Sequence, residues 1–228
     1  MEAGRGDRAA LAAAATRARP VALAREHVLP VLPVLAPLLP DGALRRGTTL
    51  TVEGAAARSL ALALAAGPSA AGSWVGAVSL PSLGLAAAAE MGIALERLLL
   101  VASPPPAEWA TVVATLVDGV DVVVVGLPRW VRTGDARRLQ ARVRQRGAVL
   151  VIVGPPGPLE AEVGMAADVV EWVGLTSGAG HLQGRRVRVA ATGRRAAARP
   201  RRVALWLPDS EGRVRADDAT VVPLRGTA

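Results

Sequence analysis

The chain has 228 residues and a formal net charge of +8, with 27 basic residues, all of them arginine, against 19 acidic ones. Lysine, asparagine, phenylalanine, tyrosine and cysteine are absent, a bias typical of a GC-rich coding sequence, so part of the positive charge reflects codon usage. Without cysteine the chain has no disulfide, thiolate metal site or cysteine nucleophile, and His27 and His181 are its two imidazoles. We therefore expect no metal and no cofactor.

Hydrophobic residues make up 51% of the chain, but they are not arranged as a membrane span. The densest β-type run, at 122–125, is far shorter than the ~20 apolar residues that cross a bilayer. The amino-terminal sequence MEAGRGDRAALAAAATRARP carries arginines among its alanines and lacks the apolar core of a secretory signal. We expect a cytoplasmic protein without membrane contact, whose length suits one α/β domain with tails.

The chain begins with a helical and proline-rich leading segment, residues 1–41. Residues 7–27 favour a helix, and prolines at 30, 33, 37 and 40 forbid a continuous helix after it. We expect residues 29–40 to form an extended strap that packs on apolar surface. The core domain is expected over residues 42–216 and a loose carboxyl-terminal tail over residues 217–228.

From residue 48 onward, short β-branched runs alternate with longer helical stretches. Strands are predicted over 48–53, 74–80, 97–101, 121–125 and 148–153, and helices over 56–66, 83–91, 107–117 and 133–146. The run DVVVV has no polar face after its aspartate, which predicts a central parallel strand covered on both sides. The alternation indicates an α/β fold with a mostly parallel sheet flanked by helices.

The pattern changes after Asp168, where strands follow one another without helices between them. They are predicted over 169–175, 187–191, 203–207 and 212–215, with a hairpin turn at 209–212. The sheet is therefore expected to finish with antiparallel strands at its carboxyl-terminal end.

Ligands of open α/β sheets bind at the carboxyl ends of the strands, so the residues just after each strand are the informative ones. In element order and hydrophobic pattern, residues 42–190 resemble the core of the RecA recombinases. The resemblance runs through LRRGTTLTVEG, AVSLPS, ERLLLVAS, VVVVGLP and AVLVIVGPP. It implies a RecA-like fold with its nucleotide site at these strand ends.

The segment that resembles the P-loop departs from the pattern that binds a triphosphate. A working loop has the form G-x-x-x-x-G-K-[ST], in which backbone N–H groups wrap the phosphates and the lysine reaches them. This chain has Gly54, three alanines, Arg58 and Ser59, so the loop is two residues short, lacks its second glycine and has arginine for lysine. Arg58 remains able to meet an anion at a helix N-terminus.

The RecA resemblance also implies a water-activating glutamate, a magnesium-supporting aspartate and a polar sensor after three other strands. Those positions hold Leu80, Gly126 and the pair Gly154 and Pro155. None of these residues coordinates a metal, accepts a proton or senses a phosphate. We therefore expect a pseudo-ATPase with no catalytic residue.

RecA recombinases hold DNA with two loops, which are short here. In PRWVRTGD, Trp130 offers a stacking ring, with Arg129 and Arg132 beside it for phosphates. A tryptophan that caps the sheet edge between solvated arginines is the other interpretation. The remaining candidate contacts to DNA or a partner are arginines on the helix at 133–146 and in the basic stretch 184–202, namely Arg137, Arg138, Arg142, Arg194 and Arg195.

Among RecA-like proteins the sequence is most similar to the ImuA group, in particular its actinobacterial ImuA-prime branch. The resemblance rests on the size, the degenerate P-loop, the short loops, the proline-rich approach and the ending RRVALWLPDSEGRVRA. It implies an accessory role in damage-induced translesion synthesis. The implied partner is an ImuB-like inactive relative of Y-family polymerases and, through it, an error-prone polymerase.

Two other functions remain open at this point. One is an ATPase with an atypical site that uses Arg58 together with Asp118 or Asp121. The other is a DNA-binding module that relies on the arginine-rich surface, for which weak, salt-sensitive DNA contact is expected.

Overall fold

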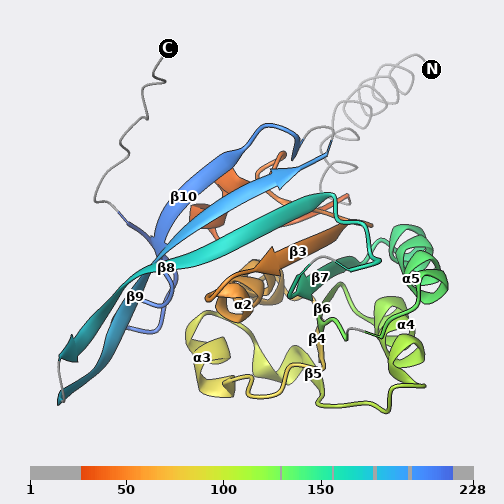
Figure 1. Cartoon of the computed structure of the whole chain (residues 1–228), viewed down its shortest axis with the longest axis horizontal. Helices are drawn as coiled ribbons and strands as arrows, with labels where there is room; N and C mark the ends of the chain where they lie inside the picture. The colour runs from red at the N-terminus through yellow and green to blue at the C-terminus, as the bar shows by residue number, and fades with distance from the viewer. Residues whose placement is uncertain (1–26, 129, 156, 177–178, 195–196, 218–228) are drawn as a thin grey trace, which may run out of the picture.

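The structure is a computed structural model that describes residues 27–128, 130–155, 157–176, 179–194 and 197–217. A nine-stranded sheet with the order β11-β10-β9-β8-β3-β7-β6-β4-β5 forms its centre (Figure 1). The six strands from β8 to β5 in this order run parallel, and β9, β10 and β11 each pair antiparallel with their neighbour. The predicted α/β fold with antiparallel strands at the carboxyl-terminal end is confirmed.

Five of the six parallel strands form where the β-branched runs predicted them. They are β3 (Thr49–Glu53), β4 (Val75–Val78), β5 (Leu98–Val101), β6 (Val122–Gly126) and β7 (Val149–Val153). In β6 and β7, alternate side chains enter two different hydrophobic cores: Val122 and Val124 lie in one, and Val123 and Val125 in the other. All four are fully buried, as expected for a central strand without a polar face.

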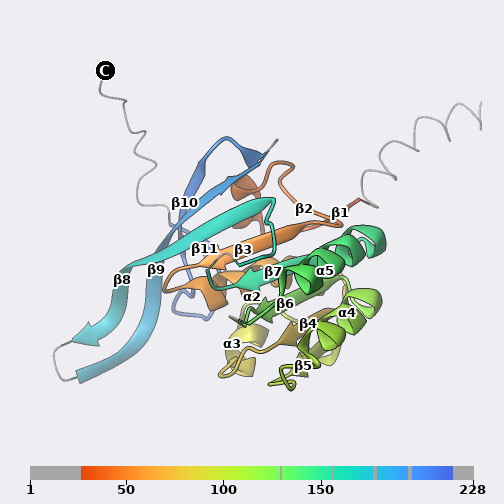
Figure 2. The same ribbon diagram turned by 45° about the vertical axis from the view of Figure 1, so that its right-hand side comes forward.

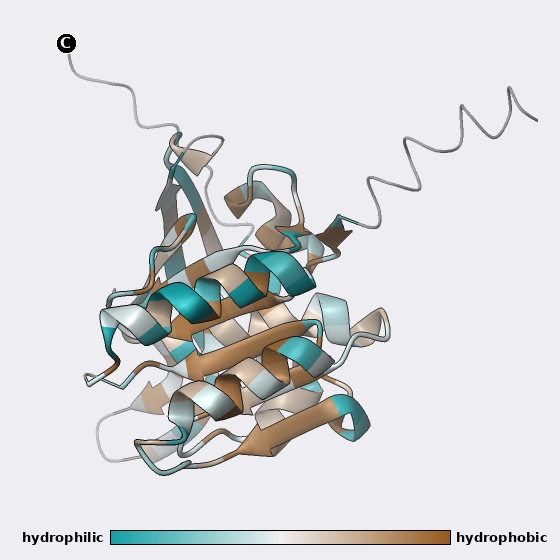
Figure 3. Ribbon diagram, turned by 90° about the vertical axis from the view of Figure 1, so that its right-hand side faces the viewer, coloured by the Kyte–Doolittle hydropathy of each residue, from teal (hydrophilic) through white to brown (hydrophobic). Residues whose placement is uncertain are grey.

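The two cores are closed by helices on opposite faces of the sheet. Helix α2 (Ala57–Ala70) and the short α3 (Leu85–Glu90) contribute to one, while α4 (Trp109–Gly119) and α5 (Thr133–Arg146) cover the other, as Figure 3 shows. On α5, Ala136, Leu139 and Val143 face the sheet, which matches their predicted helical spacing.

The described part of the leading segment, from residue 27 onward, packs into the first core, but it is not extended throughout. Residues 1–26, which hold almost all of the helix predicted over 7–27, lie outside the described residues. Strand β1 (Val28–Leu29) pairs with β2 (Leu44–Arg45), and between them lies the 3-10 helix η1 (Pro33–Leu38), which corrects the extended prediction over that stretch. The prolines are compatible with this helix because its bonds come from other residues, as from the Leu35 N–H to the Leu32 carbonyl at 2.9 Å. The buried leucines of η1 bear out the predicted packing on apolar surface.

Helix α2 continues beyond its predicted end at residue 66. The helix runs to Ala70, with Pro68 inside it. A Cβ at Gly67 would meet Val31 Cα at 2.6 Å. The glycine therefore lets the backbone of the leading segment lie directly against the backbone of the helix. Tertiary contact, which the local sequence does not reveal, therefore explains the glycine at this position.

Strands β8 (Val163–Thr176) and β9 (Ala179–Gly193) are much longer than predicted and form an arm that leaves the body of the protein (Figure 2). The ends of the two strands are rich in alanine and glycine, which have low β-propensity. These ends are strands because β8 and β9 pair with each other there. β8 pairs with β3 only over residues 163–166. Beyond that point its outer edge has no strand beside it in the described part of the chain.

The last strands are shorter and end the sheet. β10 (Arg201–Trp206) leads through a turn to β11 (Arg215–Ala216), so the strand predicted at 212–215 is mostly turn. The hairpin turn at 209–212 is confirmed: the Asp209 carboxylate accepts hydrogen bonds from the N–H groups of Glu211 and Arg213, both at 2.9 Å. No helix in the described residues is long and apolar enough to cross a membrane.

Candidate functional site

An open pocket of about 810 Å³ lies at the carboxyl ends of the parallel strands. β3 and β4 follow each other in the chain but are separated in the sheet by β7 and β6, and such a reversal opens a crevice at the strand ends. The structure brings together here every residue of the predicted degenerate nucleotide site, namely Gly54, Arg58, Ser59, Leu80, Gly126 and Gly154.

The turn between β3 and α2 is closed against the neighbouring strand β8. The Ala56 N–H donates to the Ala167 carbonyl at 3.1 Å. Gly54 has a φ of +96°, and a Cβ there would meet the same carbonyl oxygen at 2.5 Å. This turn therefore has backbone contacts on the side where a longer P-loop would need room.

The positions expected to carry catalytic groups are apolar, and one of them is also crowded. A Cβ on Gly126 would collide with the carbonyl oxygen of Ser79. Leu80 packs against the first core. Glu53, exposed at the end of β3, contributes the single carboxylate among the residues that line the pocket.

The pocket has one wall residue that sequence reasoning missed, Arg185 of β9. Only 8% of this residue is exposed. Its guanidinium donates to the Leu207 carbonyl and to the Ser59 hydroxyl, each at 2.7 Å, and lies 5.2 Å from the ring centre of Trp172. Burial lowers the pKa of Arg185 from its usual value. A single arginine in a basic stretch gives no sequence signal for this position.

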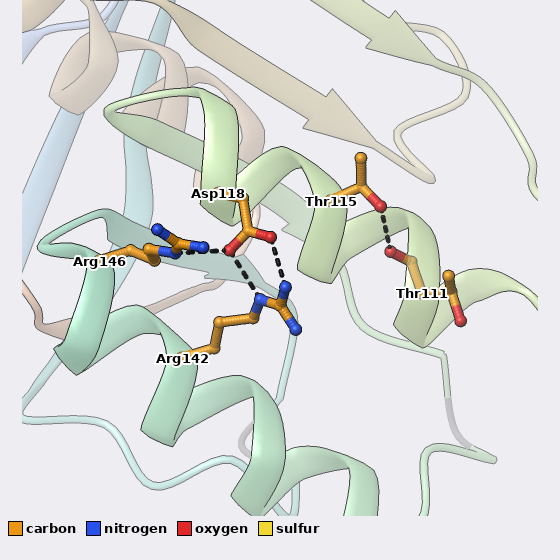
Figure 4. A network of polar contacts seen from close by, with 5 residues as sticks. All are labelled: Thr111, Thr115, Asp118, Arg142 and Arg146. Atoms are coloured by element: carbon orange, nitrogen blue, oxygen red, sulfur yellow. Dashed lines mark hydrogen bonds and ion pairs between the residues drawn. The ribbon is translucent and has the colours of Figure 1, made fainter.

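The carboxylates considered for an atypical ATPase lie at the opposite ends of the strands. Asp121 comes just before β6, where it accepts from Arg46 Nη2 at 2.8 Å and from the Trp74 N–H at 3.2 Å. Asp118 ends α4 and faces α5, as Figure 4 shows. The structure therefore does not bring either aspartate together with Arg58.

Asp118 forms an ion-pair cluster between α4 and α5 (Figure 4). Its carboxylate accepts from Arg142 through Nε at 2.6 Å and through Nη2, and from Arg146 Nε at 3.0 Å. The hydrogen bonds from Arg142, followed by its charge and the contacts of Arg146, lower the pKa of Asp118. Arg142, a predicted DNA or partner contact, thus holds the two helices together.

Trp130 lies on the surface next to a buried tryptophan. The residue is 47% exposed, and its ring meets the Trp109 ring edge-on, with centroids 6.1 Å apart. Together with Arg132 they line a second pocket of about 450 Å³. The Trp109 Nε1 has no hydrogen-bond partner in the described structure. The two tryptophans are thus packed against each other, with Trp109 buried and Trp130 partly exposed to solvent.

The other predicted arginine contacts are scattered. Arg138 lies 3.6 Å from Asp135, and Arg194 pairs with Glu160 at 2.6 Å. Arg132 and Arg137 are exposed and form no ion pair within the described residues. Arg129 and Arg195 lie outside the described residues. No group of three acidic or histidine side chains suited to a metal ion occurs in the described chain.

The fold and the pocket define an α/β protein whose strand-end site carries two arginines, glycines and apolar side chains. The chain belongs to the family of the MT3502 N-terminal domain, whose model matches residues 37–159. That match extends from η1 past the last pocket residues of β7 and ends before the β8–β9 arm.

A curated relative is the uncharacterized protein Rv3395c of Mycobacterium tuberculosis (strain ATCC 25618 / H37Rv). It is 42% identical over 120 residues, which cover 50% of this chain and 56% of the relative. The match thus spans about half the length of each protein.

Proposed function

We propose that the chain is a RecA-like accessory protein of DNA-damage-induced translesion synthesis, of the ImuA-prime type, which works by binding and not by hydrolysis. The observation that carries this proposal is the pocket at the strand ends. The P-loop, glutamate, aspartate and sensor positions that the RecA resemblance implies lie together in this pocket. The last three hold Leu80, Gly126 and Gly154, which offer no metal ligand and no proton acceptor.

The proposed partner is an ImuB-like inactive Y-family polymerase, and through it an error-prone polymerase. The β8–β9 arm is the surface we assign to this contact. Four of its large apolar side chains are about half exposed: Val170 at 51%, Trp172 at 48%, Leu175 at 53% and Leu182 at 43%. Exposed apolar groups that cluster on one element favour a protein partner over solvent.

The arm also offers a backbone edge. Beyond residue 167, β8 pairs with a strand on one side only within the described residues, so its outer N–H and C=O groups have no strand partner there. An extended segment of a partner can pair with such an edge, and the exposed side chains then provide specificity.

Co-purification tests the partner, and two surface variants test the arm. We expect the wild-type chain to retain an ImuB-like protein in both pull-down directions, and Leu175→Glu to weaken retention at least about tenfold, since a buried charge costs more than 1.4 kcal/mol. Leu100→Glu is the matched control, because Leu100 is 47% exposed on β5 at the other end of the sheet.

The outcomes separate the proposed partner from the proposed contact surface on the arm. No retention of the partner in either direction would contradict the proposed function. If Leu100→Glu loses the partner and Leu175→Glu retains it, the contact surface includes β5 and the assignment to the arm is wrong.

A further inference from the structure

Arg185 is a buried cation that has no counter-charge among the described residues. It is 8% exposed, and its two hydrogen-bond acceptors, the Leu207 carbonyl and the Ser59 hydroxyl, are neutral. Its third neighbour is the Trp172 ring. A buried cation is normally paired with a carboxylate, because burial without a counter-charge costs several kcal/mol. Arg185 has no such pair among the described residues.

The surroundings of Arg185 in the pocket are positive. Arg58 lines the same pocket and forms no ion pair in the described part of the chain. Helix α2 begins at Ala57 with no side-chain cap and no acidic residue in its first turn, so its N-terminal partial charge is not offset. Against two guanidinium groups the pocket lining has one carboxylate, that of Glu53.

The rest of the pocket is shaped for more than a free ion. Its volume of about 810 Å³ lies within the usual range of small-molecule sites, roughly 300–1,000 Å³. Apolar side chains of α2, the loop after β4 and α3 form one wall, namely Leu62, Leu80, Leu83, Ala87 and Met91. A ligand with an anionic group and a less polar body suits this lining, because the arginines can bind the anionic group and the apolar wall can contact the body.

We propose that this pocket binds a small phosphorylated molecule, whose phosphate is the missing counter-charge of Arg185 and is also bound by Arg58. A phosphate suits the site because arginine donates two parallel hydrogen bonds to it and a helix N-terminus favours its charge. The site needs neither hydrolysis nor magnesium. It does not rest on the proposed function, but it shares Trp172, which Arg185 contacts, with the arm surface assigned to the partner.

Pyrophosphate is the probe, with the full chain in solution. We expect sodium pyrophosphate to raise the melting temperature above that in sodium chloride of equal ionic strength, since a ligand that binds only the folded state stabilises it. Arg58→Gln should weaken the pyrophosphate Kd about tenfold, the loss of one charge-assisted hydrogen bond. Arg137→Gln, an equal charge change on the exposed face of α5, should leave the Kd unchanged.

Arg185→Met distinguishes ligand binding from a structural role. We expect this variant to melt no lower than wild type without pyrophosphate, since it removes a buried unpaired charge, and to lose the pyrophosphate shift. An equal melting loss with and without pyrophosphate would assign Arg185 to structure alone. The proposal is also overturned if wild type shows no shift beyond sodium chloride, or if Arg58→Gln and Arg137→Gln have the same Kd.

Discussion

Gly126 shows at the level of one residue how little room the strand ends leave for a side chain. Its position corresponds to the magnesium-supporting aspartate of the resemblance, but the Ser79 carbonyl occupies the place of a Cβ. We expect Gly126→Asp to lower the free energy of unfolding by about 1–3 kcal/mol, the usual cost of overpacking. Urea unfolding of both proteins measures this change.

Gly134 is the control for Gly126, since a Cβ added there meets nothing within 4 Å on helix α5. Gly134→Ala should leave the stability unchanged or raise it by up to about 1 kcal/mol, because alanine favours helix. If Gly126→Asp is as stable as this control, the Ser79 carbonyl does not restrict a side chain at position 126.

The pKa of Asp118 gives a pH prediction at the same scale. Arg142 lowers it below the ordinary value of 3.8, so the folded state holds the carboxylate charged where the unfolded state begins to protonate. The stability from this cluster is therefore complete above the ordinary pKa and is lost as the pH falls through the lowered one. Asp118→Asn should lack this acid-sensitive part.

Melting curves of wild type and Asp118→Asn from neutral pH down to acid measure the effect. We expect a wild-type advantage that is largest near neutral pH and shrinks in acid. About 1 M salt should reduce the advantage at neutral pH, because an exposed ion pair is screened. A difference that does not vary with pH would mean that the cluster contributes through packing only.

At the level of elements, η1 ties the leading segment to the sheet. Leu35 of this helix is fully buried in the first core. Leu35→Ala should lower the free energy of unfolding by about 2–5 kcal/mol, the range for buried leucines. Leu85→Ala on α3, where the leucine is 44% exposed, should change it by less than about 0.5 kcal/mol. Equal effects in the two variants would show that η1 is not part of the cooperative unit.

The β8–β9 arm illustrates what local sequence misses at this scale. Propensity predicted strands at 169–175 and 187–191, and it missed the glycine- and alanine-rich ends that complete the arm. Pairing across the hairpin, including two irregular positions near Val170 and Gly174, fixes those ends. The same pairing places Arg185 opposite Trp172 and so directs it to the pocket.

For the whole molecule, the charge of +8 does not mark one DNA groove. Several arginines pair with acids, as Arg142, Arg146 and Arg194 do. We expect DNA association to be weak and to disappear between about 50 and 200 mM salt, since only phosphate contacts would drive it. Fluorescence anisotropy with a short oligonucleotide measures this, and binding that persists at the higher salt would favour the DNA-binding module.

The whole-molecule test of the ATPase alternative is turnover. With Asp118 and Asp121 at the far ends of the strands, we expect no magnesium-dependent release of phosphate from ATP above the rate without protein. Hydrolysis that Arg58→Gln abolishes would contradict the pseudo-ATPase proposal. A pyrophosphate shift without hydrolysis would agree with both the proposed function and the anion pocket.

The sequence by itself determined the order of strands and helices, the buried central strand at 122–125 and the side chains that stand at the strand ends. These features are local. The periodicity of a segment determines on which face of the helix or strand each side chain lies, and the residue type determines which chemical groups the side chain carries. The tertiary structure alone decided that Gly67 meets the leading segment, that Gly126 has no room, and that Arg185 reaches Ser59 across 126 residues of chain. Those contacts depend on which strands lie side by side, and no local pattern encodes that choice.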